Sequence, residues 1–193
     1  LREVKDDRLV LIKNTENLGV GGAVKRGYLE AVARGAEIVV KVDGDGQMDT
    51  TQIKRLVFPL QNSRADYAKG NRFDRLDHLF AMPKVRLLGN AFLSLMSKVS
   101  SGYWTVTDPT NGFTAITKQA LEKMELQKVS DRYFFESDML FRLNLAGAVV
   151  QDVPMAARYG SETSNLSVAK SIFEFTWKHF VNFNKRIFYR YYL

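Results

Sequence analysis

The spacing of apolar positions along the chain predicts an α/β fold. Short, mostly apolar runs predict strands at 9–12, 38–42, 66–70, 113–116 and 148–153. Apolar residues three and four positions apart predict helices at about 23–34, 51–60, 85–100, 118–124 and 135–146. The first strand, helix and second strand form a β-α-β unit, which is typical of a sheet covered by helices.

The predicted strand at 38–42 stops in a cluster of carboxylates and glycines. Asp43 and Asp45 are separated by one glycine, so their oxygens can turn toward one point. Open α/β sheets bind ligands at the carboxyl ends of their strands, and paired oxygen ligands suit Mg²⁺ or Mn²⁺ that also holds substrate phosphates. An acidic, glycine-rich surface turn explains the same residues, and the motif alone does not decide between these interpretations.

Composition narrows the class of partner. The 193 residues include 46% hydrophobic and 25% charged residues, an ordinary composition for one domain with a full core. The net charge of +7 and the pI near 9.6 indicate an anionic partner, such as nucleic acid, a phosphorylated substrate or an anionic membrane surface. Without cysteine, disulfides and thiolate metal sites are excluded, which fits a reducing, cytoplasmic compartment.

Neither a signal peptide nor an apolar run long enough to span a bilayer is found in the sequence. Its first residues lack an initiator methionine and lead almost at once into the predicted strand at 9–12. We therefore expect the chain to begin inside a domain. Residues 73–84 are charged and aperiodic and end in Pro83-Lys84, and we interpret them as a loop that acts as a lid over the site.

The carboxyl-terminal segment is unusually rich in aromatic residues. Helical spacing relates Phe173, Trp177, Phe180, Asn184 and Ile187, and the basic residues Lys178, Lys185, Arg186 and Arg190 lie among them. An aromatic and basic helix is attracted to an anionic bilayer interface. The alternative is a terminal helix that packs on its own domain or on a second copy in a homo-oligomer.

Two other functions fit parts of the sequence. Gly19-x-Gly21 before a helix, with Asp43 at the end of the next strand, resembles a dinucleotide-binding fingerprint of an NAD-dependent oxidoreductase, but Val24 replaces the third glycine and Asp45 would repel a pyrophosphate. A basic nucleic-acid-binding module is the other alternative. It would need a clustered basic face with stacking aromatics, whereas the basic residues here are dispersed.

Six short motifs occur in the order seen in family 2 glycosyltransferases. They are Asn17-x-Gly19-x-Gly21-x-Ala23, Val42-Asp43-Gly44-Asp45-Gly46-Gln47, Gly70-Asn71-Arg72, Asp108-Pro109-Thr110-Asn111-Gly112-Phe113, Phe135-Glu136 with Arg142-Leu143, and Val153-Pro154 with Arg158-Tyr159-Gly160-Ser161-Glu162-Thr163-Ser164. The chain most resembles the polyprenyl-phosphate, dolichol-phosphate mannosyltransferase-like branch. Each motif is weak alone, and their shared order across residues 17–164 carries the resemblance.

The resemblance implies a glycosyltransferase-A fold, Rossmann-like, with a mixed, mostly parallel sheet flanked by helices. It implies transfer of a sugar, with inversion, from a nucleotide-diphosphate sugar to an acceptor, which in this branch is a polyprenyl phosphate; a glycan is the other acceptor that we consider. Such a reaction belongs to cell-envelope or polysaccharide synthesis at the cytoplasmic face of the membrane. We expect a catalytic domain at 1–165, a separate amphipathic helix at 166–193 and no nucleic-acid partner.

Roles for single residues follow from the same resemblance. Asp43 and Asp45 look like the pair that binds Mg²⁺ or Mn²⁺, with Gln47 beside them. Among the remaining residues, Arg72 and Arg158 would hold donor or acceptor phosphates, whereas Asp108 and Glu136 would line the acceptor side. One of these two carboxylates would be the general base for a hydroxyl acceptor, whereas a lipid phosphate is already anionic and needs no strong base.

The chain departs from the family pattern at three places. Asn111 stands where the family usually has Ser before the Gly-Phe pair, and Thr114 stands where it often has Arg. Thr163 replaces a basic residue near the Arg158 motif. The first strand of the family and its nucleotide-base contacts would lie before Leu1, and further membrane helices would follow Leu193.

Overall fold

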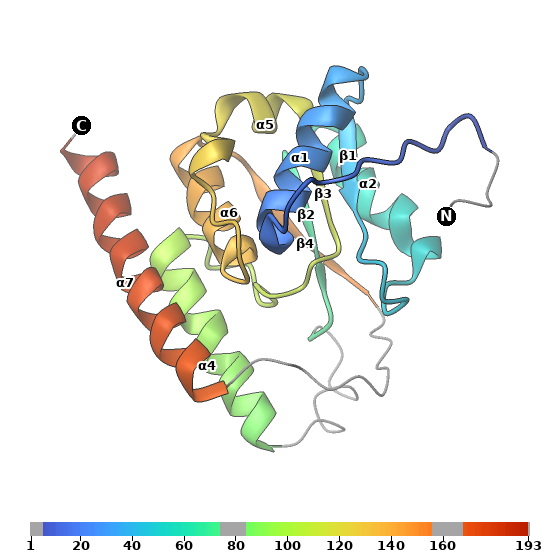
Figure 1. Ribbon diagram of the computed structural model, residues 1–193. Helices are drawn as coiled ribbons and strands as arrows, with labels where there is room; N and C mark the ends of the chain where they lie inside the picture. The colour runs from blue at the N-terminus through green and yellow to red at the C-terminus, as the bar shows by residue number, and fades with distance from the viewer. Residues whose placement is uncertain (1–5, 74–83, 156–167, 193) are drawn as a thin grey trace.

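A four-stranded mixed sheet forms the centre of the molecule (Figure 1). The computed structural model describes residues 6–73, 84–155 and 168–192, with the side chains of 84–87 and 168–172 outside that description. The strands follow the order β1-β3-β2-β4, with bounds β1 (Ile38–Lys41), β2 (Tyr67–Asn71), β3 (Thr114–Thr117) and β4 (Val150–Pro154). Three strands run in one direction, and β3 runs antiparallel between β1 and β2.

The register of the sheet places two lysines on the same face. Lys41 of β1 and Lys69 of β2 are both paired with Thr114 of β3, from opposite sides. Residues directly opposite each other in antiparallel strands point to the same face of the sheet. Tyr67 and Ile116, two positions along, belong to the core on that face. The sheet therefore directs both ammonium groups toward the same layer of helices.

Helices cover both faces of the sheet (Figure 1). On the face of the two lysines, α1 (Gly19–Ala33), α5 (Lys118–Lys123) and α6 (Phe135–Leu145) contribute to the larger hydrophobic core. The other face is covered by α2 (Ile53–Gln61), whose Leu56 and Leu60 pack with Ala68, Ala115 and Val153. Two 3₁₀ turns, η1 (Thr50–Gln52) and η2 (Leu126–Lys128), precede α2 and follow α5.

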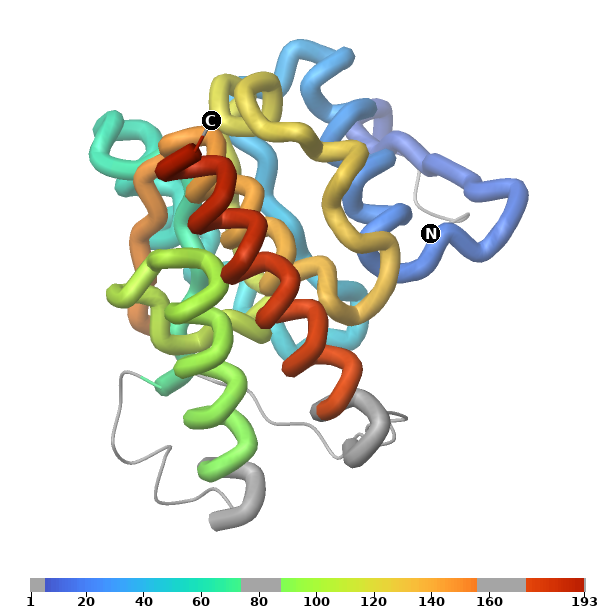
Figure 2. Tube along the Cα trace, turned by 90° about the vertical axis from the view of Figure 1, so that its left-hand side faces the viewer, coloured from blue at the N-terminus to red at the C-terminus, as the bar shows by residue number. Residues whose placement is uncertain are grey.

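Two longer helices, α4 (Lys84–Ser101) and α7 (Val168–Tyr191), lie side by side against α6 (Figures 1 and 2). One face of α7 holds polar groups that bind the body of the protein. Asn182 donates to Asp138 Oδ1 of α6 at 2.8 Å, and His179 Nδ1 shares a 2.7 Å hydrogen bond with Ser100 of α4. In addition, Arg186 donates to two carbonyls at the end of α4. This contact face is separate from the aromatic stripe of α7.

Most of the predicted elements are confirmed, but the strand predicted at 9–12 is wrong. Residues 9–14 form no strand, and Leu9, Val10 and Leu11 are exposed. The apolar run has no neighbouring strand, and an unpaired segment cannot satisfy its backbone groups in a sheet. The first β-α-β unit is therefore not formed by the described residues. The lid predicted at 73–84 lies almost wholly outside them.

The second correction concerns the glycine turn, which is the first turn of α1. The helix begins at Gly19 instead of Ala23, and the amides of Gly21 and Gly22 donate to the carbonyl oxygen of Asp131 at 2.8 and 3.2 Å. A side chain at Gly21 would collide with the backbone oxygen of Ser130. These glycines are needed for a close contact with the 130–131 segment, whose carbonyl oxygen binds two amides in the first turn of α1.

The two glycines of α1 at positions 21 and 27 give a matched stability test. Gly21→Ala inserts a Cβ against a backbone oxygen, so we expect a loss of about 1–3 kcal/mol in the free energy of unfolding. Gly27→Ala meets no atom within 4 Å, so it should gain about 0.5–1 kcal/mol through helix propensity. Urea denaturation measures both, and equal effects of the two substitutions would contradict the packing assigned to Gly21.

His179 makes the free energy of unfolding depend on pH in the acidic range. The imidazole is 2% exposed, and burial lowers its pKa to about 4. Below a pH of about 6.5 the unfolded chain binds a proton that the folded protein does not, so stability falls as the pH drops toward 4. We expect this histidine to account for a loss of up to about 3 kcal/mol across that range.

Chemical denaturation of wild type and His179→Asn between pH 7 and pH 4 measures this effect. The asparagine keeps a polar group near Ser100 but cannot titrate. Titrations shared by both proteins cancel in the difference, so the wild type should lose more stability than the variant. Parallel curves would show that His179 does not titrate on unfolding.

Candidate active site

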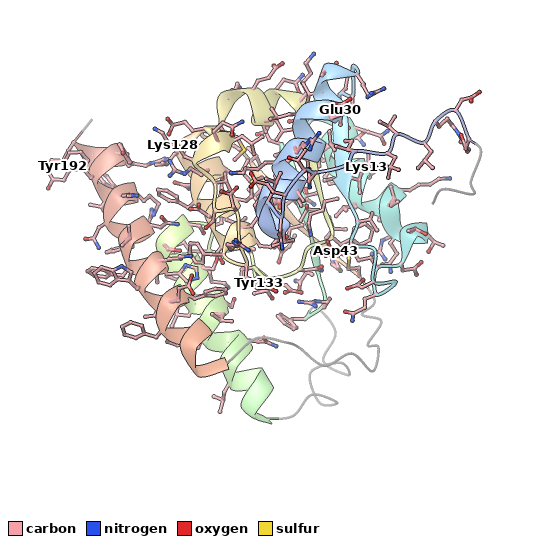
Figure 3. The ribbon with its side chains drawn as sticks, in the orientation of Figure 1. Lys13, Glu30, Asp43, Lys128, Tyr133 and Tyr192 are labelled. Carbon is pink, nitrogen blue, oxygen red and sulfur yellow. The ribbon has the colours of Figure 1, made fainter. Side chains whose placement is uncertain are left out.

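The predicted metal pair follows directly from the end of β1. Asp43 lies beyond the carboxyl end of β1, away from Glu30 of α1 (Figure 3). Its side chain is 39% exposed, whereas Asp45 lies in the exposed turn and accepts a 3.0 Å hydrogen bond from the amide of Gln47. Asp49 accepts from the amide of Thr51 at 3.1 Å and caps η1. The turn therefore has a fixed backbone and two carboxylates near solvent.

A buried ionic cluster lies directly behind Asp43. Lys41 Nζ is 2.8 Å from Asp43 Oδ1 and 3.1 Å from Glu136 Oε1. Lys69 Nζ is 3.5 Å from the other oxygen of Glu136, so one carboxylate joins the ends of β1 and β2. Glu136 stands in the first turn of α6, where the helix dipole also favours a negative charge. We call Lys41, Lys69, Glu136 and Asp43 the ion cluster.

The ion cluster also holds the turn before β3. Lys41 donates to the carbonyl oxygen of Gly112 at 3.1 Å, and Lys69 donates to that of Asn111. A Cβ at Gly112 would overlap Lys41 Nζ and Asp43 Oδ2, so only glycine leaves room for the pair. Because β3 is reversed, its amino end meets the carboxyl ends of β1 and β2. Backbone and side chains from four segments therefore converge on one place.

Burial and charge act in opposite directions on the two lysines. Burial lowers the pKa of Lys69, although Glu136 and Asp108 oppose this effect. Burial also acts to lower the pKa of Lys41, but Glu136 and Asp43 outweigh it and raise that pKa. Burial, and then the charge of Glu136, raises the pKa of Tyr67 beside the cluster. The cluster lies in a poorly solvated region, where charge interactions are strong.

A second charged pair lies at the end of β2. Arg72 binds Asp108 in a bidentate manner, with Nε to Oδ2 at 2.7 Å and Nη2 to Oδ1 at 2.9 Å. Asp108 is fully buried, and its Oδ2 also accepts from the backbone amide of Arg72. The side chain of Arg72 is 30% exposed. Asp108 therefore fixes the direction of a guanidinium group that still reaches solvent.

Four of the predicted site residues belong to two groups of ion-paired side chains. Asp43 and Glu136 meet through Lys41, and Arg72 meets Asp108. Asp45 and Gln47 lie in the turn beside Asp43, whereas Arg158 lies outside the described residues. Sequence reasoning missed Lys41 and Lys69. For Lys41 the signal was a lysine at the end of an otherwise apolar strand, since a buried charge needs a partner.

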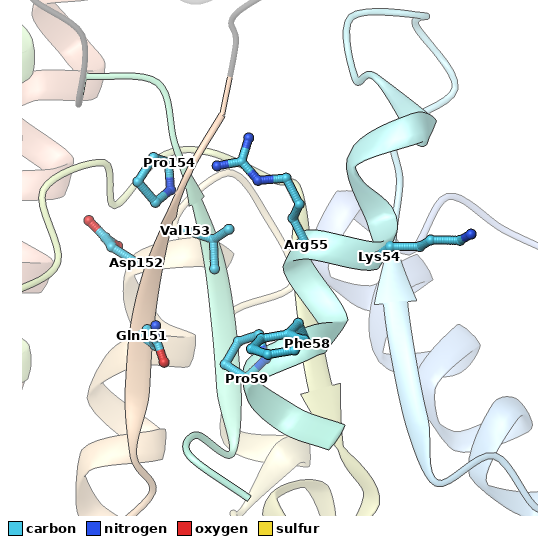
Figure 4. Close-up of a pocket in the computed structure, with 8 residues that line it drawn as sticks. All are labelled: Lys54, Arg55, Phe58, Pro59, Gln151, Asp152, Val153 and Pro154. Carbon is cyan, nitrogen blue, oxygen red and sulfur yellow. The ribbon is translucent and has the colours of Figure 1, made fainter. Parts of the chain in front are cut away.

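A separate cavity of about 470 Å³ lies between α2 and β4 (Figure 4). Phe58, Pro59 and Val153 form its apolar side, and Lys54 and Arg55 extend from α2. None of the predicted site residues that the structure describes lines this cavity. It is distinct from the place where the ion cluster and the Arg72 pair lie.

The oxygen atoms near Asp43 fit a divalent ion that takes some of its ligands from the protein and the rest from a substrate. The described residues contain no group of three or more Asp, Glu, His or Cys side chains that could hold a metal by themselves. The protein ligands available here are oxygen atoms: the carboxylates of Asp43 and Asp45 and the side-chain carbonyl oxygen of Gln47. Mg²⁺ is commonly bound by one or two carboxylates together with substrate phosphates and water, and this composition meets that requirement.

Comparison with known proteins agrees with the fold. The protein-family model described as glycosyl transferase family 2 matches residues 1–125. Glucosyl-3-phosphoglycerate synthase from Mycobacterium tuberculosis, in a crystal structure with Mn²⁺, UDP and phosphoglyceric acid, superposes with a TM-score of 0.58. That comparison covers 92% of this chain and 55% of the other, at 16% identity, so it shows the fold alone. The glycosyltransferase-A fold predicted from the sequence is confirmed.

Curated relatives are similar over most of the chain. A UDP-N-acetylglucosamine–dolichyl-phosphate N-acetylglucosaminyltransferase from Methanococcus voltae is 32% identical over 152 residues, which cover 79% of this chain and 60% of that protein. A polyprenol monophosphomannose synthase from Mycolicibacterium smegmatis is 28% identical, with 77% and 56% covered. The chain thus spans less than two thirds of the length of these relatives. From its family match and these similarities, we conclude that the chain belongs to family 2 of the glycosyltransferases.

Proposed function

We propose that this chain forms the catalytic part of a metal-dependent, inverting glycosyltransferase. It would transfer a sugar from a nucleotide-diphosphate sugar to a polyprenyl phosphate. The observation that carries the proposal is the Asp43-Gly44-Asp45 turn at the carboxyl end of β1, backed by the ion cluster and flanked by Arg72. Residues 1–165 would form the catalytic domain, and 166–193 the helical appendage.

Asp43 and Asp45 would hold Mg²⁺ or Mn²⁺, with Gln47 beside them. When bound, the ion would supply positive charge to the diphosphate leaving group. The proposal gains support from the structural neighbour that contains Mn²⁺ and UDP. Arg72 would contribute a second positive charge from a direction set by Asp108, as a bidentate pair orients a guanidinium group. Arg158 remains a proposed phosphate ligand from the sequence motif.

Asp108 and Glu136, the two carboxylates proposed to line the acceptor side, are both held in ion pairs, and this favours a phosphate as the acceptor. The oxygens of Asp108 are engaged by Arg72, and each oxygen of Glu136 faces a lysine ammonium. Because the oxygens of both carboxylates are engaged in ion pairs, neither is free to take a proton from a sugar hydroxyl. A lipid phosphate is already anionic and needs no such base. The relatives named for dolichyl-phosphate and polyprenol substrates agree with this choice.

The exposed side of α7 supports binding to a membrane surface. Phe173, Trp177, Phe180, Phe188 and Tyr191 recur at helical spacing and are all exposed, opposite the face that contacts α4 and α6. Leu88, Phe92 and Leu95 form a second exposed stripe on α4. Within the described ranges no helix is long and apolar enough to cross a membrane. We propose that α7 lies at the cytoplasmic face of the membrane and presents the lipid acceptor.

The proposed metal site can be tested by the thermal stability of the protein with UDP, GDP or NAD, with and without Mn²⁺. We expect UDP or GDP to raise the Tm only when Mn²⁺ is present, because the ion joins the diphosphate to the two carboxylates. Asp45→Asn should abolish that rise while leaving the Tm without ligand nearly unchanged, since Asp45 is exposed. Stabilisation by NAD without metal would instead support an oxidoreductase.

The proposed membrane surface can be tested by flotation with vesicles that contain anionic lipid. Trp177→Ala with Phe180→Ala should reduce the bound fraction several-fold, because these rings are exposed and stack on each other. Lys185→Gln with Arg190→Gln should weaken binding mainly at low salt. Arg186 is unsuitable for this test, since it binds the end of α4.

Phe58→Ala is the matched control for the flotation experiment. Phe58 is an exposed aromatic residue of α2, on a helix that covers the other face of the sheet. Its removal should leave vesicle binding unchanged. Flotation that depends equally on Phe58 and on the α7 rings would count against a defined membrane face.

A further inference from the structure

Lys41 uses all of its hydrogen-bonding capacity inside the protein. Its ammonium group contacts Asp43 Oδ1 at 2.8 Å, Glu136 Oε1 at 3.1 Å and the Gly112 carbonyl oxygen at 3.1 Å. An ammonium has three donors, and the side chain is only 6% exposed. The positive charge therefore stays in the site, and it lies against a carboxylate that is proposed to bind a metal ion.

A divalent ion and Lys41 compete for the same carboxylate. The ion needs an oxygen of Asp43, and Lys41 Nζ holds Oδ1 at hydrogen-bond distance. Placing two more positive charges nearby is costly in a poorly solvated region, because like charges repel more strongly there. Lys41 cannot move into water to avoid this cost, since its side chain is buried. Within the contacts described, its remaining charged partner is Glu136.

Glu136 is positioned to become the main ion-pair partner of Lys41. Its Oε2 is 3.5 Å from Lys69, which is longer than the Lys41 contact and leaves Oε1 for Lys41. A small rotation of the Lys41 side chain would strengthen the contact to Glu136 and release Asp43. The carbonyl of Gly112 would keep the third hydrogen bond during this change. Both partners are already in contact, so no rearrangement of the backbone is required.

We propose that Lys41 is a resident counter-ion for Asp43 that transfers its contact to Glu136 when a divalent ion binds. The proposal rests on the proposed function, and it makes Lys41 a positioning residue. In the free protein the lysine keeps Asp43 neutralised, so a metal ion alone binds weakly. A nucleoside diphosphate brings negative charge that offsets the added positive charge. Metal and nucleotide therefore bind together, and the ion is not held tightly between reactions.

Binding of Mn²⁺, followed by the electron paramagnetic resonance signal of the free ion, tests the proposal without measuring activity. Lys41→Met removes the competing charge and keeps the length of the side chain. Its affinity for Mn²⁺ alone should rise by about tenfold relative to wild type, the scale expected for a partly exposed ion pair. Glu136→Gln removes the alternative partner of Lys41, so its affinity for Mn²⁺ alone should fall.

The opposite signs of these effects separate the proposal from a structural role. If the ion cluster only stabilised the ends of the strands, both variants would lose Mn²⁺ affinity in proportion to lost stability. Lys25→Met is the matched control, because Lys25 of α1 is also a buried lysine in an ion pair, with its Nζ 2.6 Å from Asp131 Oδ1. It should not change the affinity for Mn²⁺. Circular dichroism and Tm identify any variant that does not fold.

The outcomes also separate this proposal from the proposed function. If wild type with UDP or GDP binds no Mn²⁺ and Asp43→Asn changes nothing, the metal-dependent function fails. If wild type binds Mn²⁺ with nucleotide, Asp43→Asn abolishes this, and Lys41→Met does not tighten binding of Mn²⁺ alone, only the counter-ion role is overturned. Should Lys41→Met fail to fold, Glu136→Gln can still overturn the proposal: unchanged or raised affinity, or a loss no larger than its loss of stability explains, contradicts it.

Discussion

The two lysines that share Glu136 set the conditions that the surrounding structure meets. An unpaired buried charge costs several kcal/mol, so Lys41 and Lys69 require a carboxylate within reach. The register of β3 places both lysines beside Thr114, and α6 presents Glu136 from its first turn. A shift of either the sheet or the helix would leave a charge without its partner. The ion cluster thus fixes the position of the turn that carries Asp43.

Local pattern was sufficient for the fold where an element carries its own apolar periodicity. The strand at 38–42 and the helices at 51–60 and 135–146 lie close to their predicted bounds. The run at 9–12 has the composition of a strand, yet a strand forms only with a neighbour, and composition does not reveal one. The start of α1 was missed for a similar reason, because the contact with Asp131 that makes its glycines favourable is remote in sequence.

The candidate site was predictable only in part. Carboxylates grouped at the end of an apolar strand stand out, so Asp43 and Asp45 could be proposed as site residues from the sequence. That Arg72 binds Asp108, and that Glu136 joins two lysines, depends on strand order and could not be inferred from spacing. For α7 the helix was predicted, but the sequence could not show that His179 and Asn182 hold it to the body while its aromatic face stays exposed.

The reversal of β3 separates two tasks within one site. The turn that carries Asp43 continues from β1, whereas Asp108 and Asn111 belong to the segment that leads into β3. These segments touch through Lys41 and Gly112 but are encoded more than sixty residues apart. Substitutions in the second segment can alter one side of the site without changing the backbone that presents the carboxylate pair. The topology of the sheet therefore allows the segment before β3 to vary in sequence separately from the turn that carries the carboxylate pair.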